Sequence, residues 1–186
     1  MAALTERRGG RREERETKMF QVGDMVCYGT TGACQITSHE ARRYGDRDVT
    51  CFVLKPVFDK SMTICVPENN EALVARIHPL MTKDELLALI RELPDQQVQC
   101  DPSPDARKQY YSETLKRGDH RELLRMVKAI YDFKKKRHAV GKRLSGFDEA
   151  AMREAENMLY TEFALVLDIQ PKDVVPFIRR ELGGEA

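Results

Sequence analysis

The sequence contains no tryptophan and lacks the motifs that mark most enzymes. No GxSxG, HExxH, Walker or glycine-rich phosphate-loop pattern occurs, and the four histidines lie far apart. No run of 18 apolar residues is present, so we expect no membrane span. These absences predict a protein that is not an enzyme and has no catalytic residues, cofactor or small-molecule substrate.

The five cysteines do not form metal-binding pairs. No CxxC spacing occurs, whereas structural zinc usually takes ligands in closely spaced pairs, so we expect no metal site. The odd number of cysteines and the absence of an apolar leader predict reduced thiols in the cytoplasm. Four of the five fall in expected strands, where a free thiol packs like a small hydrophobic side chain. The cysteines are Cys27, Cys34, Cys51, Cys65 and Cys100.

Charge is unevenly distributed, although the net charge of the chain is only +1. Ala106–Arg143 contains thirteen Lys or Arg and four Asp or Glu, a local charge of +9. Leu144–Ala186 contains four and nine, a local charge of −5. This separation indicates one surface that suits an anionic partner.

The pattern of short strands begins at Phe20–Ile36, FQVGDMVCYGTTGACQI. Its two halves flank a glycine-bounded turn, the arrangement of a β-hairpin. Further strands are expected over 48–54 and 62–67, where Pro67 closes the last one. Four or five short strands predict a small SH3- or Tudor-like β-barrel over residues 19–76. Residues 1–18 are polar, and we expect a disordered or weakly helical extension. The side chains expected to line one side of the hairpin are Val26, Tyr28, Cys34 and Ile36.

Residues 77–186 carry helix signals and predict an all-α domain of about five helices, so the fold class is α+β. Cap residues precede most of the apolar periodic segments. Residues 94–104 contain three prolines and predict a linker. The expected helices follow Thr82, Ser103, Asp119, Ser145 and Pro171, and the last is expected to be interrupted or bent at Pro176.

Basic residues gather on three consecutive elements of this helical half. In the helix expected over 121–137, apolar residues fall on one arc and most cations lie opposite. Such a basic surface can bind a phosphate backbone, and the alternative is an ordinary solvated helix face. Zinc-finger spacing, RNP-type aromatic motifs and basic zippers are absent, so binding without sequence preference is expected. The cations are Arg107, Lys108, Lys116, Arg117, Arg121, Arg125, Lys142 and Arg143.

Two groups near the basic region have alternative interpretations. Glu154, Glu156 and Glu162 are close enough for acid–base chemistry, but we expect a solvated helix face. The aromatic residues flanking the basic region are expected in the core, with a wedge against an unstacked base as the alternative. These aromatic residues are Tyr110, Tyr111 and Phe147.

Three stretches together resemble one known family. They are the opening VGDMVCYGTTG, the strand end VPENN at residues 66–70, and the helical text LKRGDHRELLRMVKAIY followed by EAENMLYTEFALVLDI. The chain resembles the CarD/CdnL family of bacterial transcription regulators over residues 19–182. The β-half alone is also similar to a module of the transcription-repair coupling factor.

The resemblance implies a cytoplasmic, nucleoid-associated adaptor with two domains. The β-domain would bind the β subunit of bacterial RNA polymerase, partly by edge-strand pairing. The helical domain would contact promoter DNA, mainly through its backbone, and stabilise the open complex. The implied polymerase contacts are Arg42, in the turn after the second strand, and Ile64, Cys65 and Pro67. The implied DNA contacts are Arg107, Lys108, Lys116 and Arg117, with Lys142 and Arg143, while Arg121 and Arg125 join them from the charge pattern.

The sequence departs from that family at the edge of the basic region. Many relatives place a tryptophan there, which wedges at the edge of the melted DNA, but residues 101–105 read DPSPD. Position 65 is cysteine, where some members have a basic residue. A second hypothesis is a protein–protein scaffold whose basic face binds an acidic protein. That hypothesis predicts no DNA binding even at low salt.

Overall fold

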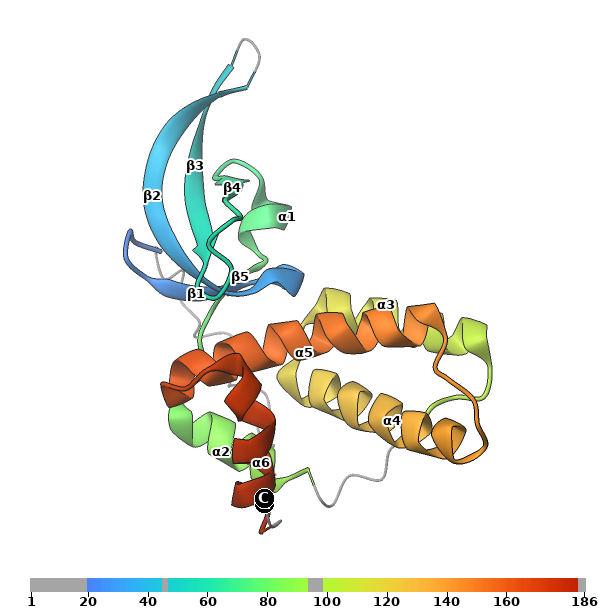
Figure 1. The fold of residues 1–186 in the computed structure, drawn as a ribbon. Coiled ribbons are helices and arrows are strands. Elements are labelled where there is room, and N and C mark those ends of the chain that lie inside the picture. Colours follow the sequence, from blue (N-terminus) through green and yellow to red (C-terminus); the bar gives the residue numbers. More distant parts are fainter. Residues whose placement is uncertain (1–19, 45–46, 94–98, 184–186) are drawn as a thin grey trace, which may run out of the picture.

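The computed structural model describes residues 20–44, 47–93 and 99–183. An antiparallel sheet comes first, and helices follow, so the fold is α+β (Figure 1). The expected extension 1–18 lies outside the described residues, as do the hairpin tip at 45–46 and part of the linker at 94–98. The sheet half contains β1 (Met25–Tyr28), the 3-10 turn η1 (Gly29–Thr31), β2 (Gly32–Tyr44), β3 (Arg47–Pro56), β4 (Ile64–Pro67), α1 (Glu71–Val74) and β5 (Ile77–Pro79).

The sheet is open, and the expectation of a barrel was wrong. The strand order is β4-β3-β2-β1-β5, and no pairing between the edge strands β4 and β5 closes it in the described part of the chain. Strands β2 and β3 pair from Cys34↔Pro56 to Tyr44↔Arg47, whereas β1, β4 and β5 have only three or four residues. A register shift between Ile36 and Ser38 marks a β-bulge, which increases local twist. The long hairpin therefore curves over short neighbours instead of completing a ring (Figure 1).

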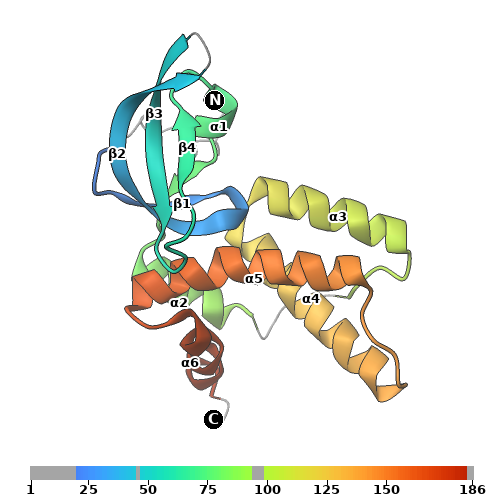
Figure 2. The ribbon, with the colours of Figure 1, turned by 45° about the horizontal axis from the view of Figure 1, so that its top comes forward.

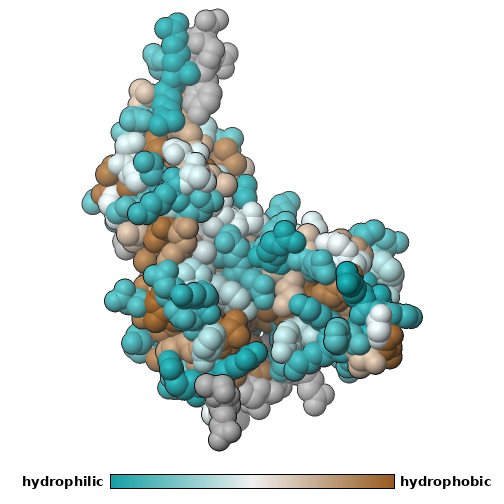
Figure 3. All heavy atoms as spheres, viewed as in Figure 1, coloured by the Kyte–Doolittle hydropathy of each residue, from teal (hydrophilic) through white to brown (hydrophobic). Residues whose placement is uncertain are grey.

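The core of the sheet follows the expected alternation. Val26, Tyr28, Cys34 and Ile36 are all buried, as predicted, because alternate residues of a strand share one face. Figure 3 shows a hydrophilic tip on the β2–β3 hairpin and apolar residues where the sheet meets the helices. The apolar cluster of the sheet is completed by Phe52, Leu54, Val66 and Ile77.

Within the described residues, five α-helices follow the sheet, in agreement with the expectation of about five. Their caps also agree, because the side chains of Thr82, Ser103, Asp119 and Ser145 each accept a hydrogen bond from the first turn. The last helix was expected to open at Pro171, with an interruption or bend at Pro176. Instead, a 3-10 turn, η2 (Pro171–Asp173), comes first, and the last helix begins at Val174 and includes Pro176. The helices are α2 (Lys83–Arg91), α3 (Pro104–Arg117), α4 (His120–Ala139), α5 (Gly146–Leu167) and α6 (Val174–Glu181).

Helix α5 is the central element of the molecule. It contacts α2, α3, α4 and α6, and it also contacts β2 and η1 (Figures 1 and 2). Its residues Leu159 and Phe163 are fully buried in the helical core. No helix within the described ranges is long and apolar enough to cross a bilayer.

The glycine-bounded turn after β1 joins the sheet to α5. The backbone N–H of Ala33 donates to Thr161 Oγ1 at 3.0 Å, and Asn157 Nδ2 donates to the carbonyls of Thr30 and Thr31 at 2.9 and 3.0 Å. Gly32 has φ +81°, and a Cβ there would lie 2.1 Å from Thr161 Oγ1. The glycine therefore lets the turn approach the helix closely, and the same turn orients the two halves.

Candidate functional site

Arg107 was expected to contact DNA, but its side chain is buried, which argues against that role. Its Nε and Nη2 donate to the two carboxylate oxygens of Asp148 at 2.9 and 3.3 Å. Its guanidinium also lies 5.0 and 5.2 Å from the ring centroids of Phe133 and Phe147. A side chain that is 6% exposed and held on several sides is not available to a phosphate. Arg107 instead joins α3 to α5.

Asp148 forms the centre of this buried network. Besides Arg107, it accepts hydrogen bonds from Ser145 Oγ at 2.6 Å and Tyr111 Oη at 3.1 Å. Burial opposes ionisation, but the hydrogen bonds from Arg107 and Ser145 and the charge of Arg107 outweigh it. The pKa of Asp148 therefore lies below its usual value, and the ion pair persists at neutral pH. The sequence identified Ser145 only as the cap residue before an expected helix.

The remaining expected DNA contacts divide into exposed and paired side chains. Arg121 pairs with Glu92 at 2.8 Å, and Arg125 pairs with Glu122 at 2.7 Å, so their charges are partly neutralised. Lys108 lies near Asp105, with 3.5 Å between the charged groups, but its side chain remains 55% exposed. The exposed cations among the expected contacts are Lys108, Lys116, Arg117, Lys142 and Arg143, together with Arg121, which is 52% exposed but held by Glu92. Leaving Arg121 aside, five exposed cations remain.

These exposed cations form two clusters rather than one. The proximal cluster, Lys116 and Arg117, occupies the last turn of α3, beside the sheet. The distal cluster comprises Lys108, near the start of α3, and Lys142 and Arg143 of the α4–α5 connection. Lys108 Nζ lies 5.2 Å from the ring centroid of Phe147 at the start of α5, and Figure 2 shows the start of α3 and the start of α5 at the same end of the helices. Lys108 and Lys116 are separated along the α3 axis by about 12 Å, from eight residues of helical rise. The basic surface therefore extends along α3.

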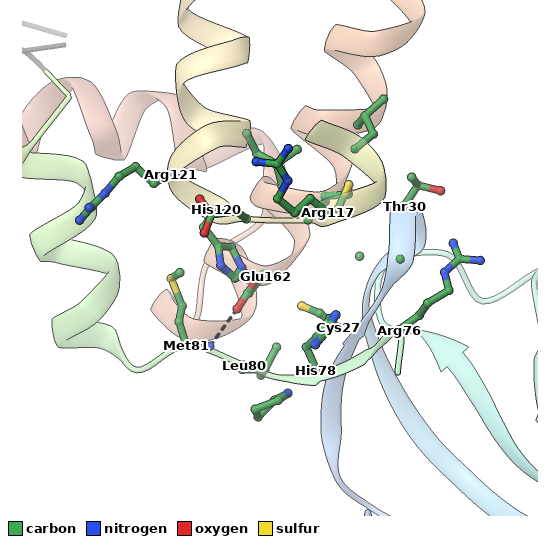
Figure 4. Close-up of a pocket in the computed structure, with 18 of the residues that line it drawn as sticks. Cys27, Thr30, Arg76, His78, Leu80, Met81, Arg117, His120, Arg121 and Glu162 are labelled. Carbon is green, nitrogen blue, oxygen red and sulfur yellow. Dashed lines mark hydrogen bonds and ion pairs between the residues drawn. The ribbon is translucent and has the colours of Figure 1, made fainter. Parts of the chain in front are cut away.

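A cleft of about 1180 Å³ separates the sheet from the helices. It is bounded by β1, η1, β5, α2, the end of α3, the start of α4 and α5 (Figure 4). Glu162 of α5 lines it and is only 1% exposed, so the expected solvated face was wrong for this residue. Glu162 accepts the backbone N–H of Met81 at 2.8 Å and pairs with His120 Nε2 at 2.5 Å. It therefore ties α5 to the segment after β5 and to the start of α4.

Cys27 faces Glu162 but is not a nucleophile. Burial disfavours the charged form of Glu162. The hydrogen bond and charge of His120, together with hydrogen bonds from the Met81 backbone and the Cys27 side chain, outweigh this effect and lower the pKa of Glu162. Burial first, and then the negative charge of Glu162, raise the pKa of Cys27 far above its ordinary value. A thiolate is therefore absent at neutral pH, and this Cys–His–Glu group is structural. The described residues also bring no three metal-ligating side chains together.

Strand β4 forms one edge of the sheet. It pairs with β3 from Leu54↔Ile64 to Cys51↔Pro67, and its other side has no strand partner in the described structure. Ile64, Cys65 and Pro67 are each half-buried. A half-exposed edge strand is a template to which an extended segment of another protein can add.

Arg42 lies within β2 and not in the expected turn, because that strand continues to Tyr44. It is paired across the ladder with Val49, beyond the end of β4, and its guanidinium contacts Glu40 at 2.9 Å. Strand β3 lies between Arg42 and the β4 edge. The structure therefore brings Ile64, Cys65 and Pro67 together and leaves Arg42 apart from them.

The aromatic residues near the basic region differ in exposure. Tyr111 is buried and Phe147 half-buried, in agreement with a place in the core, whereas Tyr110 is 37% exposed. Tyr131 was expected on the apolar arc of α4 but is 38% exposed, with Lys135 Nζ 4.5 Å from its ring centroid. Of the three candidates for a wedge, Tyr110 is therefore the one that solvent reaches.

Comparison with known proteins identifies the sheet half. A family model described as the CarD-like/TRCF RID domain matches residues 20–79. The match runs from Phe20 to the end of β5 and so includes the whole sheet and α1. No curated protein matches the chain.

Proposed function

Because residues 20–79 form a CarD-like/TRCF RID domain, we propose that this protein is a transcription regulator that joins bacterial RNA polymerase to promoter DNA. The RID family interacts with the β subunit of RNA polymerase. The observation that carries the proposal is the firm attachment of this domain, through Ala33 and Thr161, to helices that present exposed cations. The sheet would bind the enzyme, and the helices would bind DNA.

The open β4 edge is the proposed contact with polymerase. Main-chain hydrogen bonds from a strand of the β subunit would supply affinity, and pockets beside alternate side chains would supply specificity. Ile64, Cys65 and Pro67 contribute the half-exposed side chains of this edge. Because residue 65 is a cysteine, the proposed contact with polymerase would carry no charge at this position. Arg42 would act only as a separate, more distant contact.

The proposed DNA contacts are the five exposed cations of the two clusters. If each neutralises one phosphate, the logarithm of affinity should fall with the logarithm of salt with a slope of about −4 to −5 on duplex DNA. Such binding is weak and independent of sequence. Holding the helices beside DNA through polymerase raises their effective concentration, so weak contacts suffice. The proximal cluster comprises Lys116 and Arg117, and the distal cluster comprises Lys108, Lys142 and Arg143.

Stabilisation of the open complex would then depend on backbone contacts. Residues 101–105, which lead into the first turn of α3, include no aromatic residue, so the wedge of related proteins has no counterpart there. Tyr110, one turn or more into α3 and 37% exposed, is the proposed aromatic contact with an unstacked base. Loss of this side chain should weaken binding to forked DNA more than binding to duplex DNA.

Two variants separate the proposed roles. Cys65→Glu places a charge on the β4 edge and should reduce capture of core RNA polymerase, while Thr50→Glu, exposed on β3, serves as its matched control. Lys116→Glu with Arg117→Glu should abolish promoter activation and leave polymerase capture intact. Equal loss of capture in both variants would contradict the division of roles. No DNA shift by the unaltered protein at low salt would favour a scaffold for an acidic protein instead.

A further inference from the structure

We propose that the cleft between the sheet and the helices binds a phosphate group of nucleic acid through Arg76, together with Lys116 and Arg117. This inference rests on the proposed function and extends it, because it assigns a DNA contact to the polymerase-binding half. Arg76 lies just before β5, and the two others end α3. All three line the same cleft, and all three are exposed.

The acidic residues that line the cleft are already engaged. Glu162 pairs with His120, and Glu92 pairs with Arg121. Asp119 accepts the N–H of Glu122 as a helix cap, and Glu85 completes the capping box with Thr82. In contrast, Arg76, Lys116 and Arg117 form no ion pair with a carboxylate in the described part of the chain. Among the described residues, positive and negative side chains are equal in number in the lining, but the charged groups of Arg76, Lys116 and Arg117 are not held by a carboxylate and can approach an anionic ligand.

The position of Arg76 is set by its neighbours. Its guanidinium lies over the ring of Tyr28, 5.2 Å from the centroid, and its carbonyl accepts the N–H of Gly29 at 3.3 Å. A Cβ at Gly29 would lie 2.3 Å from Arg76 Nη2, so glycine leaves the space that the guanidinium occupies. A stacked, planar guanidinium loses less freedom on binding phosphate than a mobile one.

Three of the apolar residues that line the cleft are covered by the helical core. Leu89, Leu123 and Met158 line the cleft but are only 8%, 1% and 9% exposed, because they already pack in the helical core. These three side chains therefore offer little surface to a partner, whereas the side chains of Arg76, Lys116 and Arg117 are exposed. Figure 4 shows Arg76 on the sheet side of the cleft and Arg117 on the helix side. A backbone phosphate between them would contact both halves of the protein.

The test is anisotropy of a labelled forked DNA measured with the full chain over a salt series. Arg76→Gln should weaken binding three- to tenfold and reduce the magnitude of the salt slope by about 1, since one phosphate contact is lost. Arg76→Lys retains the charge and should keep the slope. Arg91→Gln, an exposed arginine of α2 outside the cleft, removes the same charge and should leave the slope unchanged.

Comparison with Lys116→Gln/Arg117→Gln separates failure of this inference from failure of the proposed function. If that double variant weakens DNA binding while Arg76→Gln does not, the inference is overturned and the proposed function stands. If neither affects DNA binding, the inference is overturned, and the proposed function fails as well if glutamine at Lys108, Lys142 and Arg143 also leaves binding unchanged. A hexaglutamate peptide is the competing probe. Binding of that peptide, but not DNA, with loss in Arg76→Gln would assign the cleft to an acidic protein and overturn the inference.

Discussion

Replacing Asp148 with asparagine would remove the negative charge that balances the buried guanidinium of Arg107. The two side chains are 1% and 7% exposed, so water cannot replace the lost charge. Removing one partner of a buried ion pair typically costs about 3–5 kcal/mol, because the other charge stays buried without compensation. For a protein of this size, that loss corresponds to a fall in Tm of roughly 6–20 °C. Denaturant unfolding followed by circular dichroism measures the free energy directly.

Two companion variants distinguish a structural role of Arg107 from a role in DNA binding. Arg107→Met with Asp148→Leu replaces the pair by apolar side chains and should recover most of the lost stability, since methionine packs well against aromatic rings. Lys108→Gln, in an exposed pair, should cost less than about 1 kcal/mol.

The same variants show what would refute the reasoning. A loss below about 1 kcal/mol in Asp148→Asn would mean that the pair is solvated. If the folded double variant at Arg107 and Asp148 lost DNA affinity as strongly as Lys116→Glu/Arg117→Glu, Arg107 would be a DNA contact after all. Retained DNA affinity is the expected result.

Two further predictions concern the contacts of α5. Gly32→Ala should destabilise the protein by about 2–5 kcal/mol, because φ is positive there and the new Cβ would overlap Thr161. Gly141→Ala, where φ is also positive but no atom lies within 4 Å of the new Cβ, should cost about 1 kcal/mol. Thermal unfolding measures both, and similar costs would contradict a tight contact between the turn and α5. Because the folded-state pKa of Glu162 is lowered, its stabilisation is present above the ordinary value of 4.5 and is lost as pH falls through the folded value. Glu162→Gln should therefore be less stable at pH 7 and lose less stability between pH 5 and pH 3, and parallel curves in urea titrations would disprove this role.

Local features of the fold were predictable from the sequence because they depend on neighbouring residues. The alternation around Val26 and Cys34 and the caps at Thr82 and Asp119 involve residues a few positions apart. Closure of the sheet was not predictable in this way. It depends on the lengths of β4 and β5 and on the curvature of the long hairpin, which no short window contains.

The candidate site shows the same contrast between properties set by neighbouring residues and properties set by packing. The sequence determined that the region around α3 is basic, and residues 20–79 carry a recognisable domain. The sequence did not determine which of these cations are exposed and which are buried. Arg107 and Lys108 are adjacent, yet one is buried against Asp148, 41 positions away, and the other is exposed.

Only the tertiary structure brought distant partners together. Glu162 meets His120 across 42 positions, and Ala33 meets Thr161 across 128. Arg76 and the end of α3 line one cleft because the glycine-bounded turn packs on α5. Charge and periodicity are properties of the chain, whereas burial and counter-charge are set by packing between segments far apart in sequence. Packing therefore decides which side chains can meet a partner.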